Sequence, residues 1–129
     1  MIIKIKRLTT LAALLAASAS WAADTPFFVG HTYLFQYDGF AAQDSFISAD
    51  TIRFIVTEGP LKGLTGEVNY QYREIRPGAY LIYWQEKDGG TVTHLDDFQQ
   101  GLSHSNYTTP KLEFYTMSGS IKQLDHHQH

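Results

Sequence analysis

Residues 76–96 constrain the fold more than any other part of the chain. The segment opens with the turn signal Pro-Gly, runs through the apolar and aromatic stretch AYLIYWQE, turns again at KDGG, and returns through TVTHL. Two runs rich in aromatic and β-branched residues, joined by a short polar turn that contains glycine, are typical of a β-hairpin. The segment therefore predicts two adjacent antiparallel strands.

Further short strands are predicted on both sides of this hairpin. In residues 31–37, Tyr33, Phe35 and Tyr37 recur at every second position and so share one face of a strand. The other predicted strands cover residues 46–56, 66–75, 102–108 and 112–124, the last as one long or two short strands. Helix signals are weak, and only residues 41–48 are expected to form a turn of helix. Short strands separated by turn signals are typical of a β-barrel or a sandwich.

Residues 1–22 are predicted to be a secretory signal peptide. Basic residues at positions 4, 6 and 7 precede a short apolar run. Ser20 and Ala22 then supply the small residues of a cleavage site. The apolar run is too short to span a bilayer, and no Cys follows it that could carry a lipid anchor. We expect cleavage after Ala22, or one residue later, and a periplasmic or secreted protein of a bacterial export route.

Residues 23–124 have the length of one domain, and residues 125–129 are predicted to be a disordered, His-rich tail. We do not interpret the tail histidines as a metal site, because they lack a rigid scaffold. The formal net charge of −3 becomes about −6 without the signal peptide. A mildly acidic chain without a basic patch argues against nucleic acid and anionic membrane surfaces as partners. We expect a monomer or a homodimer.

Glu86 is the first candidate for a functional side chain. Alternation along the strand places Tyr80, Ile82, Trp84 and Glu86 on one face. If that face points inward, Glu86 is a carboxylate at the end of an aromatic slot, and desolvation would suit it to general acid or base chemistry. If the face points outward, Glu86 is a surface carboxylate at the end of a hairpin.

His94 and Arg53 are two further candidates with two possible orientations each. A three-residue loop after Glu86 would put His94 on the face of Trp84, whereas an even-numbered loop would put it on the opposite face. Arg53 stands between Ile52 and Phe54 in an apolar strand. It could hold an anion inside a barrel or point outward into solvent.

Motifs for metals and cofactors are absent from the sequence. It contains no HExxH, no CxxC and no Gly-rich phosphate loop, so we predict neither a metal nor a cofactor. Ser103, His104 and Ser105 are adjacent, but neighbouring side chains of a strand face apart, so they do not predict a catalytic triad.

Four segments resemble the MoaF-like branch of the lipocalin-type (calycin) barrels. They are residues 28–39, 76–86, 91–94 and 106–110, and the strongest element is the pattern G-x-Y-x-x-x-W-x-E that ends at Glu86. The resemblance implies a small antiparallel β-barrel of about seven to nine strands, with little helix and an internal apolar pocket. Nothing in these residues binds a pterin or a metal, so the cofactor chemistry that the family name suggests is not carried over.

The same places are also similar to phenolic acid decarboxylase, a cofactor-free barrel enzyme that acts on hydroxycinnamic acids. This resemblance puts Glu86 at the position of the catalytic glutamate and Tyr37 at one of two carboxylate-binding tyrosines. Phe35 occupies the position of the other tyrosine, and residues 61–65 offer no match for the catalytic arginine. Without that hydroxyl and that arginine, the electrostatic positioning for decarboxylation is missing, and we do not expect decarboxylase activity.

Taken together, the sequence predicts an exported barrel that binds a small, partly apolar molecule in its interior. The predicted pocket residues are Phe35, Tyr37, Arg53, Tyr72, Trp84, Glu86 and His94. One alternative is a cofactor-free lyase or isomerase that uses Glu86 as its acid or base, with Tyr37 and either Arg53 or His94 holding the substrate. Another is a structural or interaction module whose interior is filled by its aromatic side chains.

Overall fold

The computed structural model describes residues 24–125 of the chain. The predicted signal peptide and the histidines of the predicted tail lie outside these residues. Asp125, the first residue of that tail, accepts a hydrogen bond from the backbone N–H of Thr32 at 3.2 Å. Within residues 24–125, no helix is long and apolar enough to cross a membrane.

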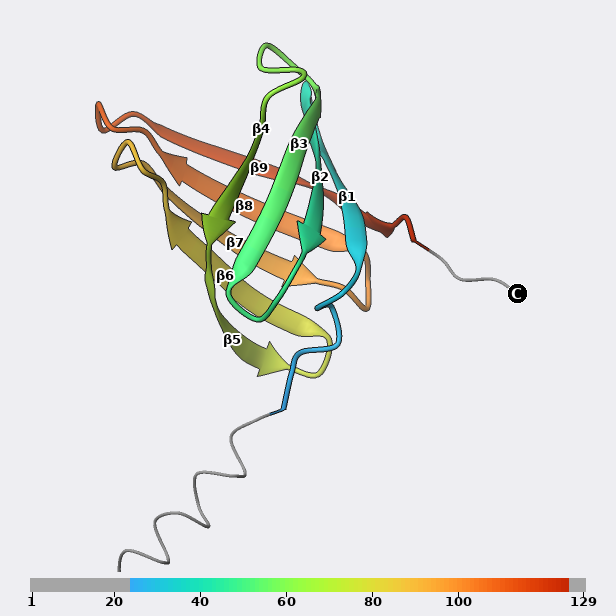
Figure 1. The fold of residues 1–129 in the computed structure, drawn as a ribbon. Helices are drawn as coiled ribbons and strands as arrows, with labels where there is room; N and C mark the ends of the chain where they lie inside the picture. Colours follow the sequence, from blue (N-terminus) through green and yellow to red (C-terminus); the bar gives the residue numbers. More distant parts are fainter. Residues whose placement is uncertain (1–23, 126–129) are drawn as a thin grey trace, which may run out of the picture.

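Nine antiparallel strands form a single sheet in the described part of the chain, in the order β4-β3-β2-β1-β9-β8-β7-β6-β5. The strands are β1 (Thr32–Tyr37), β2 (Phe40–Phe46), β3 (Thr51–Glu58), β4 (Thr65–Asn69), β5 (Gln71–Arg76), β6 (Ala79–Gln85), β7 (Thr91–Asp97), β8 (Leu102–Thr108) and β9 (Phe114–Gln123). The sheet curls strongly into an open barrel (Figure 1). The predicted all-β fold and strand number are confirmed.

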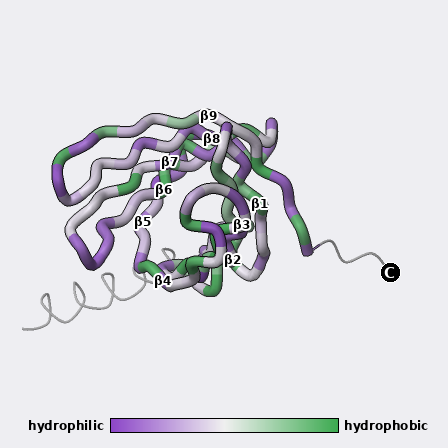
Figure 2. Tube along the Cα trace, turned by 90° about the horizontal axis from the view of Figure 1, so that it is seen from above, coloured by the Kyte–Doolittle hydropathy of each residue, from purple (hydrophilic) through white to green (hydrophobic). Residues whose placement is uncertain are grey.

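The barrel stays open between β4 and β5, which are the two edges of the sheet. Away from this opening, the first strand, β1, pairs with the last strand, β9, so that the N-terminal and C-terminal parts of the domain are joined in one sheet. Gly119 of β9 lies opposite Tyr37 in this pairing, and a Cβ there would overlap the backbone oxygen of Gln36. Glycine therefore allows these two strands to approach closely. Viewed from above in Figure 2, β1–β4 form one side of the barrel and β5–β9 the other.

An aromatic cluster fills one end of the barrel. Its centre is Phe28, which is fully buried and lies with its ring centroid 4.6 Å from that of Phe46 and 5.2 Å from that of Phe98. We call the cluster the aromatic plug; its members are Phe28, Phe46, Tyr70, Tyr72, Tyr80 and Phe98. Edge-to-face and tilted ring pairs of this kind add to the stability that the buried apolar area provides. The plug thus fills that end of the barrel with buried aromatic side chains.

The first half of the chain differs from the sequence prediction. Residues 40–46 form strand β2 and not a turn of helix, and the strand predicted for 46–56 begins only at Thr51. Tyr37 pairs directly with Phe40 across the two-residue turn Asp38-Gly39, where Gly39 has a φ of 78°. Such a turn reverses the chain at once, so β2 hydrogen-bonds to β1 on one side and to β3 on the other.

The strands of the second half agree with the prediction. Strand β7 runs from Thr91 to Asp97 and completes the predicted hairpin. The last strand, β9, is one long strand from Phe114 to Gln123, which is one of the two predicted alternatives. Pairing extends across these strands, because Asp96 lies opposite Ser103 of β8 and Ser103 lies opposite Gly119 of β9.

Candidate functional site

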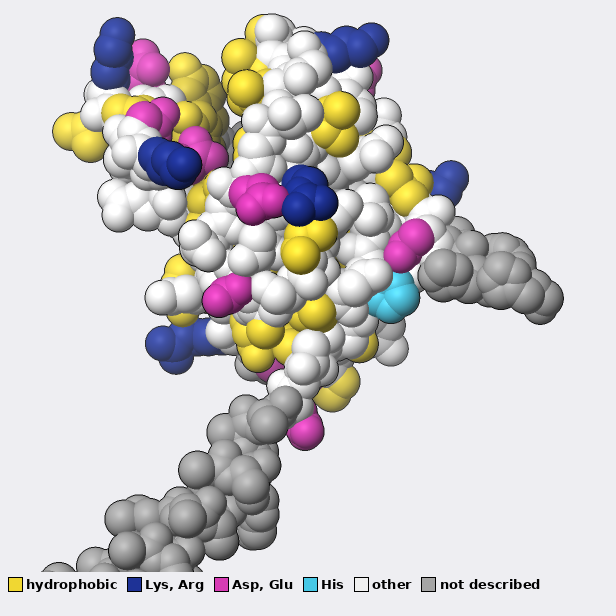
Figure 3. Space-filling view, in the orientation of Figure 1, with side chains coloured by type: hydrophobic (Ala, Val, Ile, Leu, Met, Phe, Trp, Pro, Cys, Tyr) yellow, Lys and Arg dark blue, Asp and Glu magenta, His cyan; other side chains and the backbone are white. Residues whose placement is uncertain are grey.

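The barrel contains a cavity of about 420 Å³ at the end opposite the aromatic plug. Its mouth lies between the β6–β7 hairpin, the β8–β9 hairpin and the β3–β4 loop. We call it the inner cavity. Most of its wall is aliphatic or aromatic, with residues such as Phe35, Ile52, Val56 and Trp84. Figure 3 shows the molecular surface hollowed between the two hairpin ends and the β3–β4 part of the sheet, with hydrophobic side chains at the hollow.

A chain of buried hydrogen bonds lies at the polar side of this cavity. The Ser103 hydroxyl donates to Oδ1 of Asp96 at 2.7 Å, and the Tyr37 hydroxyl lies 2.7 Å from Oγ of Ser103. Because Ser103 has a single hydroxyl proton, Tyr37 is the donor in the second bond. Nδ1 of His94 lies 3.3 Å from Oδ2 of Asp96. Asp96 and Ser103 are 0% exposed and His94 is 7% exposed.

Strand register explains how the sequence builds this network. His94 and Asp96 are two positions apart on β7, so their side chains share one face. Across the pairing with β8, Asp96 lies opposite Ser103 and His94 lies opposite Ser105. Directly opposite side chains of an antiparallel pair are close enough to interact. The four polar side chains are therefore brought together by β7 and β8, and Tyr37 reaches them from β1.

Asp44 of β2 is a second buried carboxyl group that lines the inner cavity. It is 6% exposed. Burial raises its pKa to about 7, an effect that His94 reduces and Asp96 increases. Among residues 24–125, we find no side-chain hydrogen bond to Asp44. This carboxyl group lines the cavity, and because its pKa is close to 7, its charge changes near neutral pH.

The pKa values of His94 and Tyr37 are both raised above their ordinary values. Burial alone lowers the pKa of His94, but the Asp96 carboxylate, the hydrogen bond with it, and Asp44 together raise the pKa above its ordinary value. Burial, helped by the charge of Asp96, raises the pKa of Tyr37 far above its usual range. Tyr37 therefore stays a hydrogen-bond donor at neutral pH, and the protonated form of His94 is stabilised relative to that of a free imidazole.

Most of the pocket residues predicted from the sequence line the inner cavity: Phe35, Tyr37, Trp84, Glu86 and His94. The loop that decides the orientation of His94 consists of residues 86–90, because Gln85 pairs with Thr91. An odd-numbered loop puts His94 on the face of Trp84, and the two ring centroids are 5.3 Å apart.

Glu86 lies near the mouth of the cavity and not near the buried polar network. Its carboxylate accepts a hydrogen bond from Nε1 of Trp84 at 3.4 Å, and the side chain is partly exposed. Of the two predicted orientations, Glu86 therefore has the inward one, since it lines the cavity. Its position at the mouth nevertheless leaves it close to solvent.

Arg53 and Tyr72 lie away from the cavity. Arg53 is exposed on the outer face of β3, and its Nε lies 2.9 Å from Oε2 of Glu67 on β4. Alternation explains this placement, since Ile52 and Val56 point inward from the same strand. Tyr72 belongs to the aromatic plug, with its ring centroid 6.1 Å from that of Phe28.

Sequence reasoning did not select Asp44, Asp96 or Ser103. Asp44 lies in the predicted turn of helix and Asp96 at the end of the predicted hairpin, and a carboxylate is ordinary at both places. The signal that could have found them is the alternation His-x-Asp in residues 94–96 and Ser-x-Ser in residues 103–105, which places polar side chains on one face of each strand.

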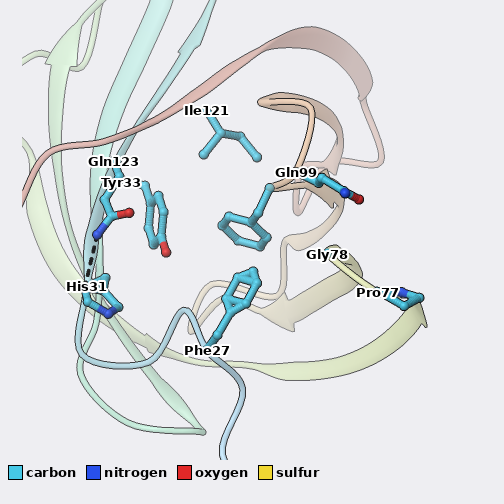
Figure 4. Close-up of a pocket in the computed structure, with 9 residues that line it drawn as sticks. Phe27, His31, Tyr33, Pro77, Gly78, Gln99, Ile121 and Gln123 are labelled. Atoms are coloured by element: carbon cyan, nitrogen blue, oxygen red, sulfur yellow. Dashed lines mark hydrogen bonds between the residues drawn. The ribbon is translucent and has the colours of Figure 1, made fainter. Parts of the chain in front are cut away.

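A second depression lies at the other end of the barrel, beyond the aromatic plug (Figure 4). We call it the end pocket; it has a volume of about 610 Å³. Phe27, Tyr33 and Ile121 line it, and His31 lies at its edge within 3.2 Å of the Gln123 amide. Although this pocket is larger, no carboxyl group lines it. The inner cavity is lined by two carboxyl groups and an imidazole, those of Asp44, Glu86 and His94, and is therefore the candidate site.

The carboxylates and histidines do not form an evident metal centre. Within residues 24–125, no group of three or more His, Cys, Asp or Glu side chains is arranged to hold a metal ion. The buried polar groups instead form hydrogen bonds with one another, and some of them line the cavity.

Comparisons with known proteins agree with this architecture. A comparison with curated proteins finds no match. A Burkholderia vietnamiensis protein described as a "putative beta-lactamase" has a crystal structure with 36% sequence identity and a TM-score of 0.77, and the match covers 79% of this chain and 100% of that one. The sequence matches the family described as MoaF-like over residues 29–122. The chain therefore belongs to the MoaF-like family.

Proposed function

We propose that this protein binds a small, partly apolar molecule in the inner cavity. The observation that carries the proposal is an apolar-walled cavity of about 420 Å³ on which a few polar groups, Asp44 and His94 among them, converge. Binding sites for small molecules are typically concave, mostly apolar, and supplied with a small number of polar groups that orient the ligand. Their volumes are typically about 300–1,000 Å³.

Other functions receive less support from the described residues. A scaffold with a filled interior is disfavoured by the cavity itself. A cofactor-free lyase or isomerase in which Arg53 holds the substrate is disfavoured, because Arg53 is paired with Glu67 on the surface. An enzyme that relies on Glu86 is disfavoured by the partly exposed position of that carboxylate at the mouth.

The description of the Burkholderia protein raises a further possibility, the hydrolysis of β-lactams. The serine enzymes of that kind use a Ser-x-x-Lys motif, and this sequence contains none. Each lysine of the described residues is exposed. We therefore do not extend that activity to this chain.

Blocking the cavity tests the proposal. Trp84 is the single tryptophan of the chain that remains after removal of residues 1–22, and it lines the cavity. We expect phenylbutanol to change its fluorescence in a saturable way. Ala42→Leu places extra carbon atoms in the cavity and is expected to weaken this binding by about tenfold or more, which corresponds to about 1.4 kcal/mol.

The matched control is Gln43→Leu, which adds the same side chain at the next position of β2. Gln43 is not among the residues that line the cavity, so this variant should bind phenylbutanol as the parent does. Equal binding by the parent and by Ala42→Leu would contradict the proposed site.

We further propose that the protein is exported, on the basis of the basic, apolar and small-residue segments of its first 22 residues. When the full chain is expressed in a bacterium, we expect the periplasmic or secreted protein to begin at Ala23 or at Asp24. N-terminal sequencing measures this directly. A protein that accumulates with Lys4 still present would contradict export.

A further inference from the structure

The charged side chains that line the inner cavity are mostly acidic. Asp44 and Glu86 contribute carboxyl groups, and neither Lys nor Arg lines the cavity. His94 is the one lining side chain of the described residues that can carry a positive charge, and it is already paired with Asp96. The cavity therefore repels anionic ligands and has an excess of groups that can receive a cation or a hydrogen-bond donor.

Among the carboxyl groups in and around this cavity, Asp44 is the one to which the described residues supply no side-chain hydrogen bond. Asp96 accepts hydrogen bonds from Ser103 and pairs with His94, and Glu86 accepts one from Trp84. Asp44 is 6% exposed, which makes it more buried than Glu86, yet no described side chain donates a hydrogen bond to it. A buried carboxylate without a partner is unfavourable, so a ligand that supplies a charged donor gains from neutralising it.

Aromatic side chains surround the space in front of Asp44. Phe35, Tyr37 and Phe40 line it from β1 and β2, and Trp84 and Tyr107 line it from the facing strands. The face of an aromatic ring attracts a cation as well as an apolar group. A wall of this kind next to a carboxylate is suited to an ammonium group that is attached to a hydrocarbon.

From these observations we propose that the inner cavity selects a protonated amine on an aryl or alkyl group, with the Asp44 carboxylate as its counterion. The inference rests on the proposed function, since it names the chemical class of the molecule bound there. The apolar wall holds the hydrocarbon part, Asp44 holds the ammonium group, and the acidic surroundings exclude the corresponding carboxylate.

The ionisable groups that face Asp44 give this site a defined pH dependence. They are Tyr37 from β1 and His94 and Asp96 from β7, whereas β3 presents the apolar Ile52 and Val56. Burial raises the pKa of Asp44 to about 7, while an alkylamine stays protonated up to about pH 10. Amine binding should therefore strengthen from pH 6 to pH 8 as Asp44 ionises, and it should release protons near neutrality.

Three probes of the same shape test the inference by titration calorimetry: phenylbutylamine, phenylbutanol and phenylbutanoate. At pH 8 we expect the amine to bind at least about tenfold more tightly than the alcohol, and the carboxylate to bind most weakly. At pH 6 the advantage of the amine should shrink. At neutral pH the amine's binding heat should depend on the ionisation enthalpy of the buffer, because protons are released.

Two variants separate the inference from its alternatives. In Asp44→Asn the amine should bind no more tightly than phenylbutanol, whereas in Glu86→Gln the amine should keep its advantage over phenylbutanol. The inference is overturned if the parent binds amine and alcohol equally, or if only Glu86→Gln loses the preference; in both cases the proposed function stands. If none of the three probes binds to the parent, the proposed function fails as well.

Discussion

Replacing Asp96 by alanine is expected to lower the free energy of unfolding by about 3–5 kcal/mol. Asp96 is fully buried, and it accepts the Ser103 hydroxyl and pairs with His94. Its loss leaves a buried imidazole and a buried hydroxyl without their acceptor, and each such group is costly in an apolar interior. For a domain of this size, we expect the melting temperature to fall by about 15 °C or more. Calorimetry or circular dichroism during heating measures the change.

The neighbouring residue Asp97 provides a matched control. Its side chain points to the other face of β7 and pairs with the exposed Arg76 at 2.7 Å. Asp97→Ala should lower the melting temperature far less than Asp96→Ala, because it removes one ion pair with an exposed arginine and one hydrogen bond from the backbone N–H of Gln100, and it leaves no buried group without a partner. If the two alanine variants melted at the same temperature, the buried network would not have the structural role that we assign to it.

Asp44→Asn is expected to stabilise the protein at alkaline pH. Burial raises the pKa of this carboxyl group from 3.8 to about 7 in the folded protein. Between these values the folded state binds more protons than the unfolded chain, so the stability of the parent falls as the pH rises from about 4 to 7. Asparagine has nearly the same shape and cannot ionise. The variant should therefore be more stable than the parent at pH 8, by up to about 4 kcal/mol.

Urea unfolding at pH 4, 6 and 8 tests this expectation. The parent and Asp44→Asn should be similar at pH 4 and should diverge as the pH rises. His94 contributes a slope of the same sign at higher pH in both proteins, because its pKa is also raised and its stabilisation is lost as it deprotonates. Asp38→Asn, in the exposed β1–β2 turn, is the control and should follow the parent. A variant that is less stable than the parent at pH 8 would show that Asp44 is stabilised as a carboxylate.

The parts of the fold that could be predicted from the sequence are those in which local pattern and burial agree. Tyr33, Phe35 and Tyr37 alternate in sequence, and all three point into the barrel. The aromatic run and the glycine turn in residues 76–96 predict a hairpin, which the structure has as β6 and β7. In these segments each local preference points to the same strand and the same face.

Strand β2 could not be predicted because its local preferences oppose its structure. Ala41 and Ala42 favour helix and Asp44 is rarely found inside a strand. Pairing on both sides, with β1 and with β3, overrides these preferences. Asp38-Gly39 is a two-residue hairpin turn, so β2 follows directly after the strand predicted for residues 31–37.

The candidate site was only partly predictable for a related reason. The orientation of His94 depends on whether the loop before β7 has an odd or an even number of residues, and strand ends cannot be placed that accurately from sequence. The burial of Asp44 and Asp96 depends on strands that lie far from them in the chain. Their proximity follows from the curl of the sheet, which no local pattern encodes.

The most direct test of the central claim is a crystal structure of the protein with phenylbutanol, a probe that does not depend on the charge of Asp44. We predict that the probe occupies the inner cavity, with its ring beside Trp84 and its hydroxyl group near Asp44 or His94. A probe found only in the end pocket beside Phe27 and Tyr33, or an inner cavity that stays empty at saturating probe, would contradict the assignment of the inner cavity as the binding site.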